Sequence, residues 1–451
     1  MQKPKKSVKT TAFLRRRNIV KKYLIADIGS TTTKVLLIQD DKILAREEAK
    51  TTVEKPEEDV SIGLQLATQL ITYKLKEEIA ECDFLFSSSA GGGLQIVAIG
   101  ITRNFTAKSA YNLALNSGAI VIDTLALDDG RIPLERIQCL DQAKPDLILF
   151  AGGFEGGAID QLVEFAALIN LSKMHRKFEV SKLPIIYAGN SFALPFVKRI
   201  LGDKFVLQTV PNINPKAGVE NFTPARQAIL NTFINHVMSS APGYKSLCDR
   251  ALRPPLPTPI AFEKILSLHS KHEDKRIYAF DMGGATTDCY SIAKNISRRS
   301  VAANLGMTYS LPYVLKQCGI KKIMSVLGKK YNEKEVLNFM GNRYIRPVTI
   351  SETEHELKIE EAIAQNIIAE AFRIHHDLRK TDYDLVIASG GFIAHHPNKD
   401  KIKQIITKAL HLGSHTSVAI DKSFILPHLG VLSQINEPLA LNLFEENVSV
   451  L

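Results

Sequence analysis

The sequence predicts an α/β fold made of two similar halves and an additional region of alternating strands and helices. Two observations carry this prediction. An apolar strand followed by a turn rich in glycine and hydroxyl residues occurs twice, at 27–34 and at 281–288. Between them, residues 83–200 alternate short apolar runs with helical stretches, which is typical of βαβ units around a parallel sheet. The chain has 451 residues, of which 45% are hydrophobic, so two to three domains with sizeable cores are expected.

The first half opens with a strand, a turn and a second strand. Apolar runs at 23–26 and 35–38 flank the first turn, and another strand is expected at 42–49. The acidic cluster after Pro56 starts a helix that reaches about Tyr73, because its apolar residues recur at near-helical spacing.

Strands and helices alternate in the additional region, which we place at 83–210. The expected strands are 84–86, 96–101, 119–125, 147–150 and 185–187, and the expected helices are 106–117, 132–142 and 160–169. Glycine-rich turns follow several of these strands. Parallel sheets bind ligands at such strand ends, although close packing of the backbone explains the glycines equally well.

The last part of the chain repeats the plan of the first. A less regular, proline-containing segment at 211–275 leads into strands at 277–280 and 289–292, on either side of the second turn. The remaining elements are expected to be helices at 308–340, 356–379 and 398–411, a strand at 385–388 and a segment at 423–432. The predicted parts are a leader (1–22), the beginning of the first half (23–82), the additional region (83–210), a connecting segment (211–275) and the second half (276–451).

The formal charge of +10 comes from one end of the chain. Residues 1–22 contain nine basic residues and no acid, so the rest of the chain is close to neutral. A nucleic-acid-binding body would need a basic folded surface, which these totals do not provide. The leader is expected to be a disordered, solvated segment. Contact with RNA, anionic lipid or an acidic partner, and a mitochondrial-type presequence, are the alternatives.

The cysteine and hydropathy patterns bear on the location of the protein. Its five cysteines are widely spaced and form no CxxC pair, which favours reduced thiols over a disulfide framework or a cysteine-bound cluster. There is no run of 18 apolar residues, so no membrane span is expected. A cytoplasmic protein is therefore the expectation.

The first turn, Asp27-Ile28-Gly29-Ser30-Thr31-Thr32-Thr33-Lys34, carries groups that suit phosphate chemistry. Its backbone N–H groups and hydroxyls can face phosphate oxygens, Lys34 supplies positive charge, and Asp27 can hold hydrated Mg²⁺. The turn is not a P-loop, because GxxxxGK[ST] is absent. An ordinary hairpin would explain it if it stood alone.

Two later motifs strengthen this interpretation. Asp281-Met282-Gly283-Gly284-Ala285-Thr286-Thr287-Asp288 repeats the order of strand, aspartate, glycine and hydroxyls, which indicates duplicated halves facing each other across a nucleotide. Ala388-Ser389-Gly390-Gly391-Phe392 follows a buried strand, and its glycines allow a base or ribose to approach the backbone closely. Each motif is weak alone, but their order and spacing together are specific.

In this order the three motifs resemble the phosphate-1, phosphate-2 and adenosine motifs of the actin, sugar-kinase and heat-shock ATPase superfamily. That resemblance implies two ribonuclease-H-like halves around a nucleotide cleft. Over nearly the whole chain after residue 22, DIGSTTTK, SSSAGGGLQIVAIG, AGGFEGG, YAGN, DMGGATTD and HLGVLS look like the MutL/GlmL family. Members of that family are encoded beside adenosylcobalamin-dependent glutamate mutase and related aminomutases. Phe154-Glu155 stands where Thr-Asp is expected, with the carboxylate retained, and the basic leader lies outside the family pattern.

The resemblance implies an accessory or reactivating protein that binds ATP and Mg²⁺ and acts on mutase subunits. Asp27 and Asp281 would hold the metal, and the catalytic groups would be Asp281, Asp288 and Lys34. Asp288, or Asp281 through a water, would orient the attacking water. The expected nucleotide-binding residues are Asp27, Gly29, Ser30, Thr31, Thr32, Lys34, Gly283, Gly284, Thr286, Thr287, Gly390 and Gly391. Glu155, within AGGFEGG, is the candidate contact for a partner or ligand.

Three other functions stay open at this point. An activase of 2-hydroxyacyl-CoA dehydratases has a nearly identical first motif, but the closely spaced cysteines of its shared cluster are missing. A small-molecule kinase would need a carboxylate base that the sequence does not locate, and a scaffold could bind ATP without turnover.

Two further sets of residues allow more than one interpretation. Residues 87–93 fit a phosphate or partner loop as well as a sheet-edge turn. The pairs His375-His376 and His395-His396 are interpreted as solvated or helix-terminal residues, because adjacent positions on a helix do not converge on one metal.

Overall fold

The computed structural model describes most of the chain: residues 21–29, 32–53, 57–79, 82–89, 94–173, 182–202, 204–234, 242–294, 296–302, 304–347, 349, 351, 353–376 and 382–451. Ser30, Thr31, Gly91–Gly93 and the leader up to residue 20 lie outside the described residues. The predictions made for them therefore stay predictions.

The first half, which we call lobe I, is built on a five-stranded sheet in the order β10-β4-β1-β2-β3. Its strands are β1 (Lys22–Ile28), β2 (Thr32–Gln39), β3 (Lys42–Lys50), β4 (Asp83–Ser88) and β10 (Leu256–Pro257). The first three strands are antiparallel, and β4 lies parallel to β1. Helix α1 (Val60–Leu75) packs on β2 and β3.

The second half, lobe II, has a six-stranded sheet in the order β13-β12-β11-β14-β15-β16. Its strands are β11 (Ile277–Met282), β12 (Thr287–Ala293), β13 (Ile296–Ala302), β14 (Leu385–Ser389), β15 (Ser417–Ile420) and β16 (Ser449–Val450). Again three antiparallel strands are followed by a strand parallel to the first. Both lobes thus share the ribonuclease-H-like plan, which confirms the predicted fold class.

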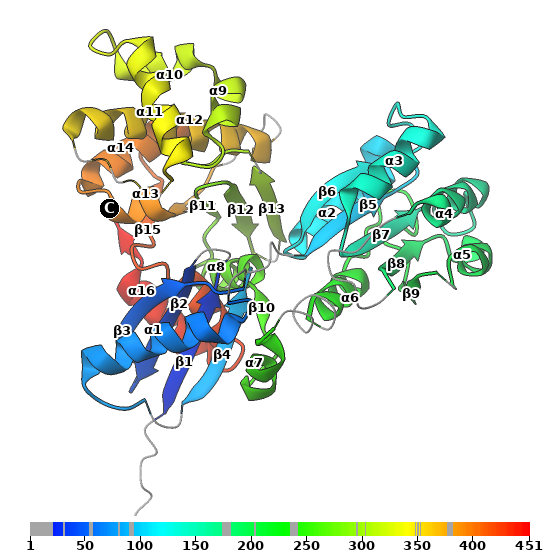
Figure 1. Ribbon diagram of the computed structural model, residues 1–451, viewed down its shortest axis with the longest axis horizontal. Coiled ribbons are helices and arrows are strands. Elements are labelled where there is room, and N and C mark those ends of the chain that lie inside the picture. The colour runs from blue at the N-terminus through cyan, green and yellow to red at the C-terminus, as the bar shows by residue number, and fades with distance from the viewer. Residues whose placement is uncertain are drawn as a thin grey trace, which may run out of the picture.

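Between β4 and β10 the chain forms a separate α/β unit, called the insert here and comprising residues 94–234. Its parallel sheet has the order β6-β5-β7-β8-β9. The strands are β5 (Gln95–Ile99), β6 (Ile120–Leu125), β7 (Leu147–Gly152), β8 (Pro184–Gly189) and β9 (Val206–Thr209). The helices are α2 (Lys108–Asn116), α3 (Pro133–Ala143), α4 (Asp160–Leu171), α5 (Leu194–Leu201) and α6 (Thr223–Thr232). Figure 1 shows the insert to one side of the two lobes.

Apolar contacts fix the insert on lobe I. Helices α3, α4 and α5 cover one face of its sheet and form a separate core with it. The other face, with α2 and α6, belongs to a continuous apolar cluster that includes strands and helix α1 of lobe I. Helix α7 (Tyr244–Arg250) contributes Tyr244 and Leu247 to this same cluster. The insert is therefore a structural extension of lobe I.

Two helices lie between the lobes. Helix α8 (Thr258–Glu273) and helix α15 (Leu426–Leu432) share an apolar cluster with strands of both sheets and with α16 (Glu437–Asn447). They cross so closely that a Cβ on Gly430 would lie 1.7 Å from the carbonyl oxygen of Ala261. Gly430 belongs to the HLGVLS segment, whose glycine is therefore required by packing between α8 and α15.

The structure differs from the sequence expectations in three places. Strand β4, placed at the start of the additional region, pairs with β1 of lobe I because its buried side chains complete that sheet. The segment 211–275 contains α6, α7 and α8. The single helix expected at 308–340 is broken at Gly319 and Gly328, which adopt φ values of 81° and 78°.

The broken segment and the remaining helices cover the outer face of the lobe II sheet (Figure 1). They are α9 (Leu311–Cys318), α10 (Ile320–Leu327), α11 (Glu333–Ile345), α12 (Glu354–His376), α13 (Gly391–His395) and α14 (Lys399–Leu410). Among the described residues, no helix combines the length and the apolar character needed to cross a bilayer.

Replacing Gly430 by alanine should destabilise the protein, because the new methyl group would overlap the Ala261 carbonyl. We expect the free energy of unfolding to fall by about 1–3 kcal/mol or more. Gly341→Ala is the control: a Cβ on this exposed glycine of α11 would have no atom within 4 Å, so alanine should add about 0.5–1 kcal/mol. Urea unfolding of both variants makes the comparison. Equal stability of Gly430→Ala and the parent would contradict the close helix crossing.

Candidate functional site: two facing turns

The first turn is closed by a backbone hydrogen bond, and two hydroxyl groups hold the side chain of its aspartate. Gly29 closes the turn by donating its N–H to the carbonyl of Thr32, at an N–O distance of 3.0 Å. The buried carboxylate of Asp27 accepts hydrogen bonds at Oδ1 from the hydroxyls of Ser87 (2.8 Å) and Thr258 (2.7 Å). Its Oδ2 accepts no hydrogen bond from the described residues. Asp27 is thus fixed in orientation with one oxygen left for a ligand.

Lys34 lies directly opposite Asp27 in the β1–β2 ladder. Its Nζ sits 5.3 Å from the ring centroid of Phe424, and its carbonyl accepts a hydrogen bond from Nε2 of His428 at 3.2 Å. Burial lowers the pKa of His428 to about 4, so the imidazole is neutral at pH 7. The backbone of Lys34 is therefore anchored to α15, while its ammonium group faces the junction of the two lobes.

The second turn repeats the geometry of the first. Gly283 donates its N–H to the carbonyl of Thr286 at 2.9 Å, as Gly29 does to Thr32. Asp281 and Asp288 are directly paired across β11 and β12, in the positions that Asp27 and Lys34 take in lobe I. The two turns thus match in hydrogen bonding, but one carries an acid–base pair and the other carries two acids.

Electrostatics show that the two turns face each other. The pKa of Asp281 rises to about 6, chiefly because burial removes its carboxylate from water and because the charge of Asp288 lies nearby. Lys34 opposes this rise, whereas Asp421 and Asp27 add to it. Two of these groups, Lys34 and Asp27, belong to the turn of lobe I. Four carboxylates and one ammonium group therefore share this junction.

Asp288 has a dedicated counter-charge. Nε and Nη2 of Arg299 donate to its Oδ1 at 3.0 and 2.5 Å, and the arginine side chain is only 3% exposed. Of the two alternatives for orienting water, this pairing disfavours Asp288 and favours Asp281, which has no such partner among the described residues.

The threonine hydroxyls of the two turns differ in direction, and one residue predicted to contact the nucleotide, Thr287, has its hydroxyl engaged elsewhere. Thr287 is fully buried and donates to the carbonyl of Leu305 at 2.7 Å, so its hydroxyl points away from the turn. Thr33 is likewise buried, with its hydroxyl 2.9 Å from that of Thr51. Thr32 and Thr286, at the tips, stay partly exposed and available.

The third motif adjoins the second turn. Strand β14 pairs with β11, so that Ser389 lies opposite Asp281. Gly390 has a φ of 121°, and a Cβ there would lie 2.2 Å from the carbonyl oxygen of Met282. A Cβ on Gly391, the first residue of α13, would have nothing within 4 Å. Gly390 is required by backbone packing, whereas Gly391 leaves open space beside the second turn.

Glu155 lies apart from these motifs, at the carboxyl edge of the insert sheet. Its carboxylate accepts hydrogen bonds from Asn212 Nδ2 at 2.8 Å and from the Ser191 hydroxyl at 2.5 Å. Partial burial opposes ionisation, but these bonds together lower the pKa of Glu155 below its ordinary value. Asn190 braces the same loops by accepting from Gly156 N and donating to the carbonyl of Ala158. Glu155 thus connects its own loop to the loops that carry Ser191 and Asn212.

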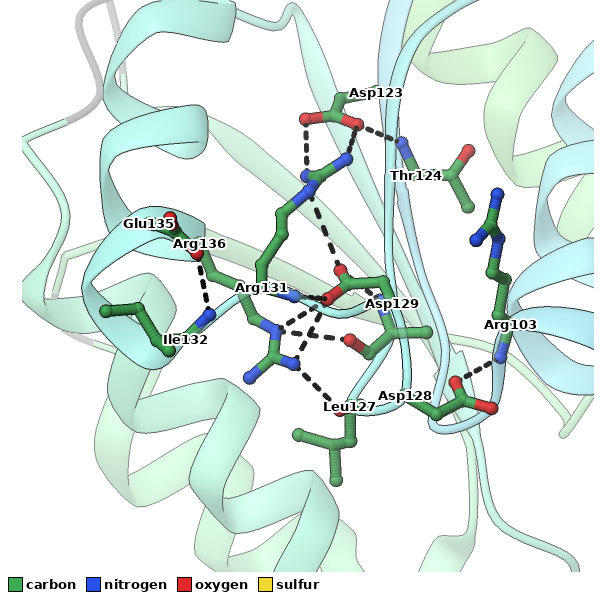
Figure 2. Close-up of polar contacts among 11 residues, drawn as sticks. Arg103, Asp123, Thr124, Leu127, Asp128, Asp129, Arg131, Ile132, Glu135 and Arg136 are labelled. Atoms are coloured by element: carbon green, nitrogen blue, oxygen red, sulfur yellow. Dashed lines mark hydrogen bonds and ion pairs between the residues drawn. The ribbon is translucent and has the colours of Figure 1, made fainter.

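The neighbouring loop of the insert is fixed by ion pairs (Figure 2). Arg131 binds Asp123 through two nitrogens, at 2.9 and 3.0 Å. The buried Arg136 donates to Asp129 and to the carbonyls at the end of β6. Arg103 N donates to Asp128 Oδ1 and so ties the loop after β5 to the loop after β6. The carboxyl edge of the insert is therefore a preordered surface.

Three of the four paired histidines, His375, His376 and His396, are buried in the structure and not solvated, whereas His395 is exposed. His375, in the last turn of α12, has its two ring nitrogens 2.6 Å from the hydroxyls of Ser291 and Ser300. Burial, reinforced by His376, lowers the pKa of His375 to about 3. His396 is buried as well, with Nε2 3.3 Å from Glu361 Oε1. Neither environment resembles a shared metal site.

Five residues of the junction were not found from sequence: Ser87, Thr258, Arg299, Asp421 and His428. Ser87 had a signal, because it belongs to the 87–93 motif and lies opposite Asp27 in the β1–β4 ladder. Asp421 had one as well, because it directly follows a buried strand. His428 had one too, because it opens the HLGVLS segment. Thr258 and Arg299 had no local signal, since each reaches the junction from a distant element.

The donor set suits a hard divalent cation. Oδ2 of Asp27 and the carboxylate of Asp281 are oxygen ligands of the kind that Mg²⁺ takes, and neither is neutralised by an ion pair to a described residue. The crowding of carboxylates that raises the pKa of Asp281 would be relieved by such a cation.

Comparisons with known proteins agree on the family. A family model described as MutL protein matches residues 23–448. Protein MutL of Clostridium tetanomorphum is 30% identical over 463 residues, an alignment that spans 91% of this chain and 96% of that relative.

Solved structures are similar at much lower identity. Nucleotide-free acetone carboxylase is 12% identical with a TM-score of 0.42, over 92% of this chain and 70% of that one. Nucleotide-free diol dehydratase-reactivating factor is 11% identical with a TM-score of 0.39, over 91% and 99%. The activator of 2-hydroxyisocaproyl-CoA dehydratase from Clostridium difficile, with bound ADPNP, is 10% identical with a TM-score of 0.34, over 94% and 95%.

Asp281→Asn should stabilise the ligand-free protein at pH 7.5. A carboxyl whose pKa rises to about 6 on folding destabilises the native state once it ionises, so this cost is absent near pH 4 and fully present above pH 7. The amide removes the cost, and we expect a gain of about 1–3 kcal/mol at pH 7.5 that disappears near pH 4. Urea unfolding with a chelator present, at both pH values, measures it. A gain that does not depend on pH would show that Asp281 is not electrostatically strained.

Proposed function

Because the chain belongs to the MutL family, we propose that it binds and slowly hydrolyses ATP as an accessory protein that reactivates an adenosylcobalamin-dependent mutase of the glutamate mutase or aminomutase type. The observation that carries the proposal is the pair of matching turns, one from each lobe, whose charged residues face each other at one junction.

The turns supply the groups that a nucleotide triphosphate needs. The N–H groups of Gly29 and Gly283 close the turns. Other backbone N–H groups of the two turns, with the tip hydroxyls of Thr32 and Thr286, would line the phosphates, and Lys34 would offset their charge. Gly391 leaves room for the ribose or base beside the second turn. Ser30, Thr31 and Gly284 remain candidates from their place in the motifs.

Asp281 is the residue best placed to orient an attacking water. Its carboxylate is partly buried, directly opposite Asp288, and free of an ion pair to the described residues. With a pKa of about 6 it is ionised at pH 7.5 and accepts a hydrogen bond from water. Mg²⁺ held by Asp27 and Asp281 would supply charge neutralisation at the phosphates. Catalysis would then be positioning and electrostatics, which accords with slow turnover.

The carboxyl edge of the insert is the proposed face for the mutase. Four aromatic side chains are 37–61% exposed there, namely Phe105, Phe154, Phe192 and Phe196. Phe105 and Phe154 touch, with ring centroids 5.6 Å apart. Glu155 and Asn190 hold the loops of Phe154 and Phe192, and the Arg103–Asp128 bond of Figure 2 ties the segment of Phe105 to the loop after β6. Clustered exposed aromatic groups on a rigid edge are typical of protein interfaces.

Mg-ATP should raise the melting temperature of the protein. At a nucleotide concentration about 100 times Kd, stabilisation of about 2.7 kcal/mol is expected. Lys34→Ala should weaken binding about tenfold or more, because it removes a charged contact to phosphate. Lys42→Ala, which removes an exposed lysine of β3 from the same sheet, is the control and should bind like the parent. Calorimetry gives the affinities. If no nucleotide shifts the melting temperature at millimolar concentration, the site assignment fails.

Hydrolysis should respond to a mutase and not to small phosphate acceptors. An inactivated adenosylcobalamin-dependent mutase is expected to stimulate phosphate release several-fold, and Asp281→Ala should abolish both hydrolysis and reactivation. Phe192→Ser, on the insert edge, should reduce stimulation while basal hydrolysis stays unchanged. Rapid phosphorylation of a sugar, carboxylic acid or amine, with no response to any mutase, would favour a small-molecule kinase instead.

A further inference from the structure

We propose that Arg299 couples the second turn to the insert, so that the occupancy of the turns and the seating of helix α2 on lobe II control each other. The proposal rests on the nucleotide site proposed above. Arg299 acts as a positioning residue, because it touches the carboxylate beside the site and the end of a helix in another unit.

Arg299 joins three elements with one side chain and its backbone. The side chain of this β13 residue holds Asp288 through Nε and Nη2, at 3.0 and 2.5 Å. Its Nη1 donates to the carbonyl of Leu115 in the last turn of α2, at 2.8 Å. Its backbone N–H donates to Oδ1 of Asn116, the final residue of α2, at 3.0 Å. A single buried cation therefore links the turn of lobe II to the insert.

The charge and burial of Arg299 make its contact with α2 sensitive to its contact with Asp288, and the reverse. A guanidinium at the carboxyl end of a helix meets the negative end of the helix dipole, so α2 and Asp288 share the same cation through different nitrogens. Both partners are poorly solvated, and a buried charge that loses its partner is costly. If Asp288 shifts, Arg299 shifts with it. The hydrogen bonds of Arg299 to Leu115 and Asn116 then change as well.

The surroundings of Arg299 allow such a shift. The insert is fixed to lobe I by a continuous apolar cluster, whereas its contact with lobe II at β13 is made of polar groups. A cavity of about 410 Å³ lies beside this contact, and its lining includes Asn112, Asn116, Glu220, Arg226, Arg298 and Arg299. Movement of lobe II relative to lobe I would therefore act on the Arg299–α2 bonds, together with the contacts of Glu263 in α8 with Arg226 of the insert and Ser297 of β13.

The nucleotide site lies at the other end of the link. Asp288 is directly opposite Asp281 and immediately follows Thr287 of the second turn. A phosphate group seated on that turn would act on Asp288 through the turn backbone and through the charge of Asp281. Thermodynamic linkage then requires the converse, that loosening α2 from Arg299 changes nucleotide affinity.

Asn116→Ala tests the link without touching the site. It removes only the acceptor for Arg299 N and leaves the Asp288 ion pair intact. Asn112→Ala is the matched control, since this residue lies one turn earlier on α2 beside the same cavity and no described residue hydrogen-bonds to its side chain. Arg299→Ala is less informative, because it leaves Asp288 unpaired and risks misfolding.

The readouts are calorimetric Kd for a non-hydrolysable ATP analogue with Mg²⁺, and amide hydrogen exchange over 108–120, both on the full chain. We expect the analogue to change exchange over 108–120 in the parent and in Asn112→Ala. In Asn116→Ala that change should shrink and Kd should shift by about fivefold or more. Tight binding with no change over 108–120, and equal Kd values in all three proteins, would overturn the coupling alone. Absence of binding to the parent would overturn the nucleotide site and the coupling together.

Discussion

Crowding of like charges where the two lobes meet is the constraint on which the remaining structure depends. Asp27, Asp281, Asp288 and Asp421 lie close enough to influence one another, and Lys34 is the ammonium group that faces them. Each carboxylate except Asp281 is stabilised by fixed donors: hydroxyls for Asp27, Arg299 for Asp288, and the N–H groups of Ile425 and Leu426 for Asp421. Asp281 has no such donor among the described residues, and burial raises the pKa of both Asp281 and Asp421. Residues that fold at such a cost are typical of sites that bind and react.

The architecture holds this junction together from three directions. Helices α8 and α15 cross between the sheets at Gly430, and each also contacts the first turn, through Thr258 and His428. The insert, packed on lobe I, reaches lobe II through Arg299. The carboxyl edge of its sheet carries the exposed phenylalanines, so the surface proposed for the mutase belongs to the same unit that Arg299 contacts through α2. A movement at the second turn would thus be transmitted to the insert directly, through Asp288 and Arg299.

Local chemistry explains which parts could be predicted from the sequence. The two turns and the adenosine-type motif were recognisable because their glycines and acids follow directly on buried strands, and the repeated plan predicted two similar halves. The motif did not indicate that the Thr287 hydroxyl donates to the carbonyl of Leu305, because one residue of register decides which face a side chain takes. His428 belongs to the HLGVLS segment, but its contact with the first turn could not be predicted, and neither could the contacts of Thr258 and Arg299, since these residues reach the turns from elements far away in sequence. The helix expected at 308–340 failed because the positive φ values at Gly319 and Gly328 interrupt an otherwise helical pattern.

The most direct test of the central claim is a crystal structure of the full chain with Mg²⁺ and a non-hydrolysable ATP analogue. The triphosphate is expected to lie between the turn at Gly29–Lys34 and the turn at Gly283–Thr286. Mg²⁺ should lie near Asp27 and Asp281, and the sugar or base beside Gly391. A nucleotide bound elsewhere, such as the carboxyl edge of the insert sheet, with both turns empty, would contradict it.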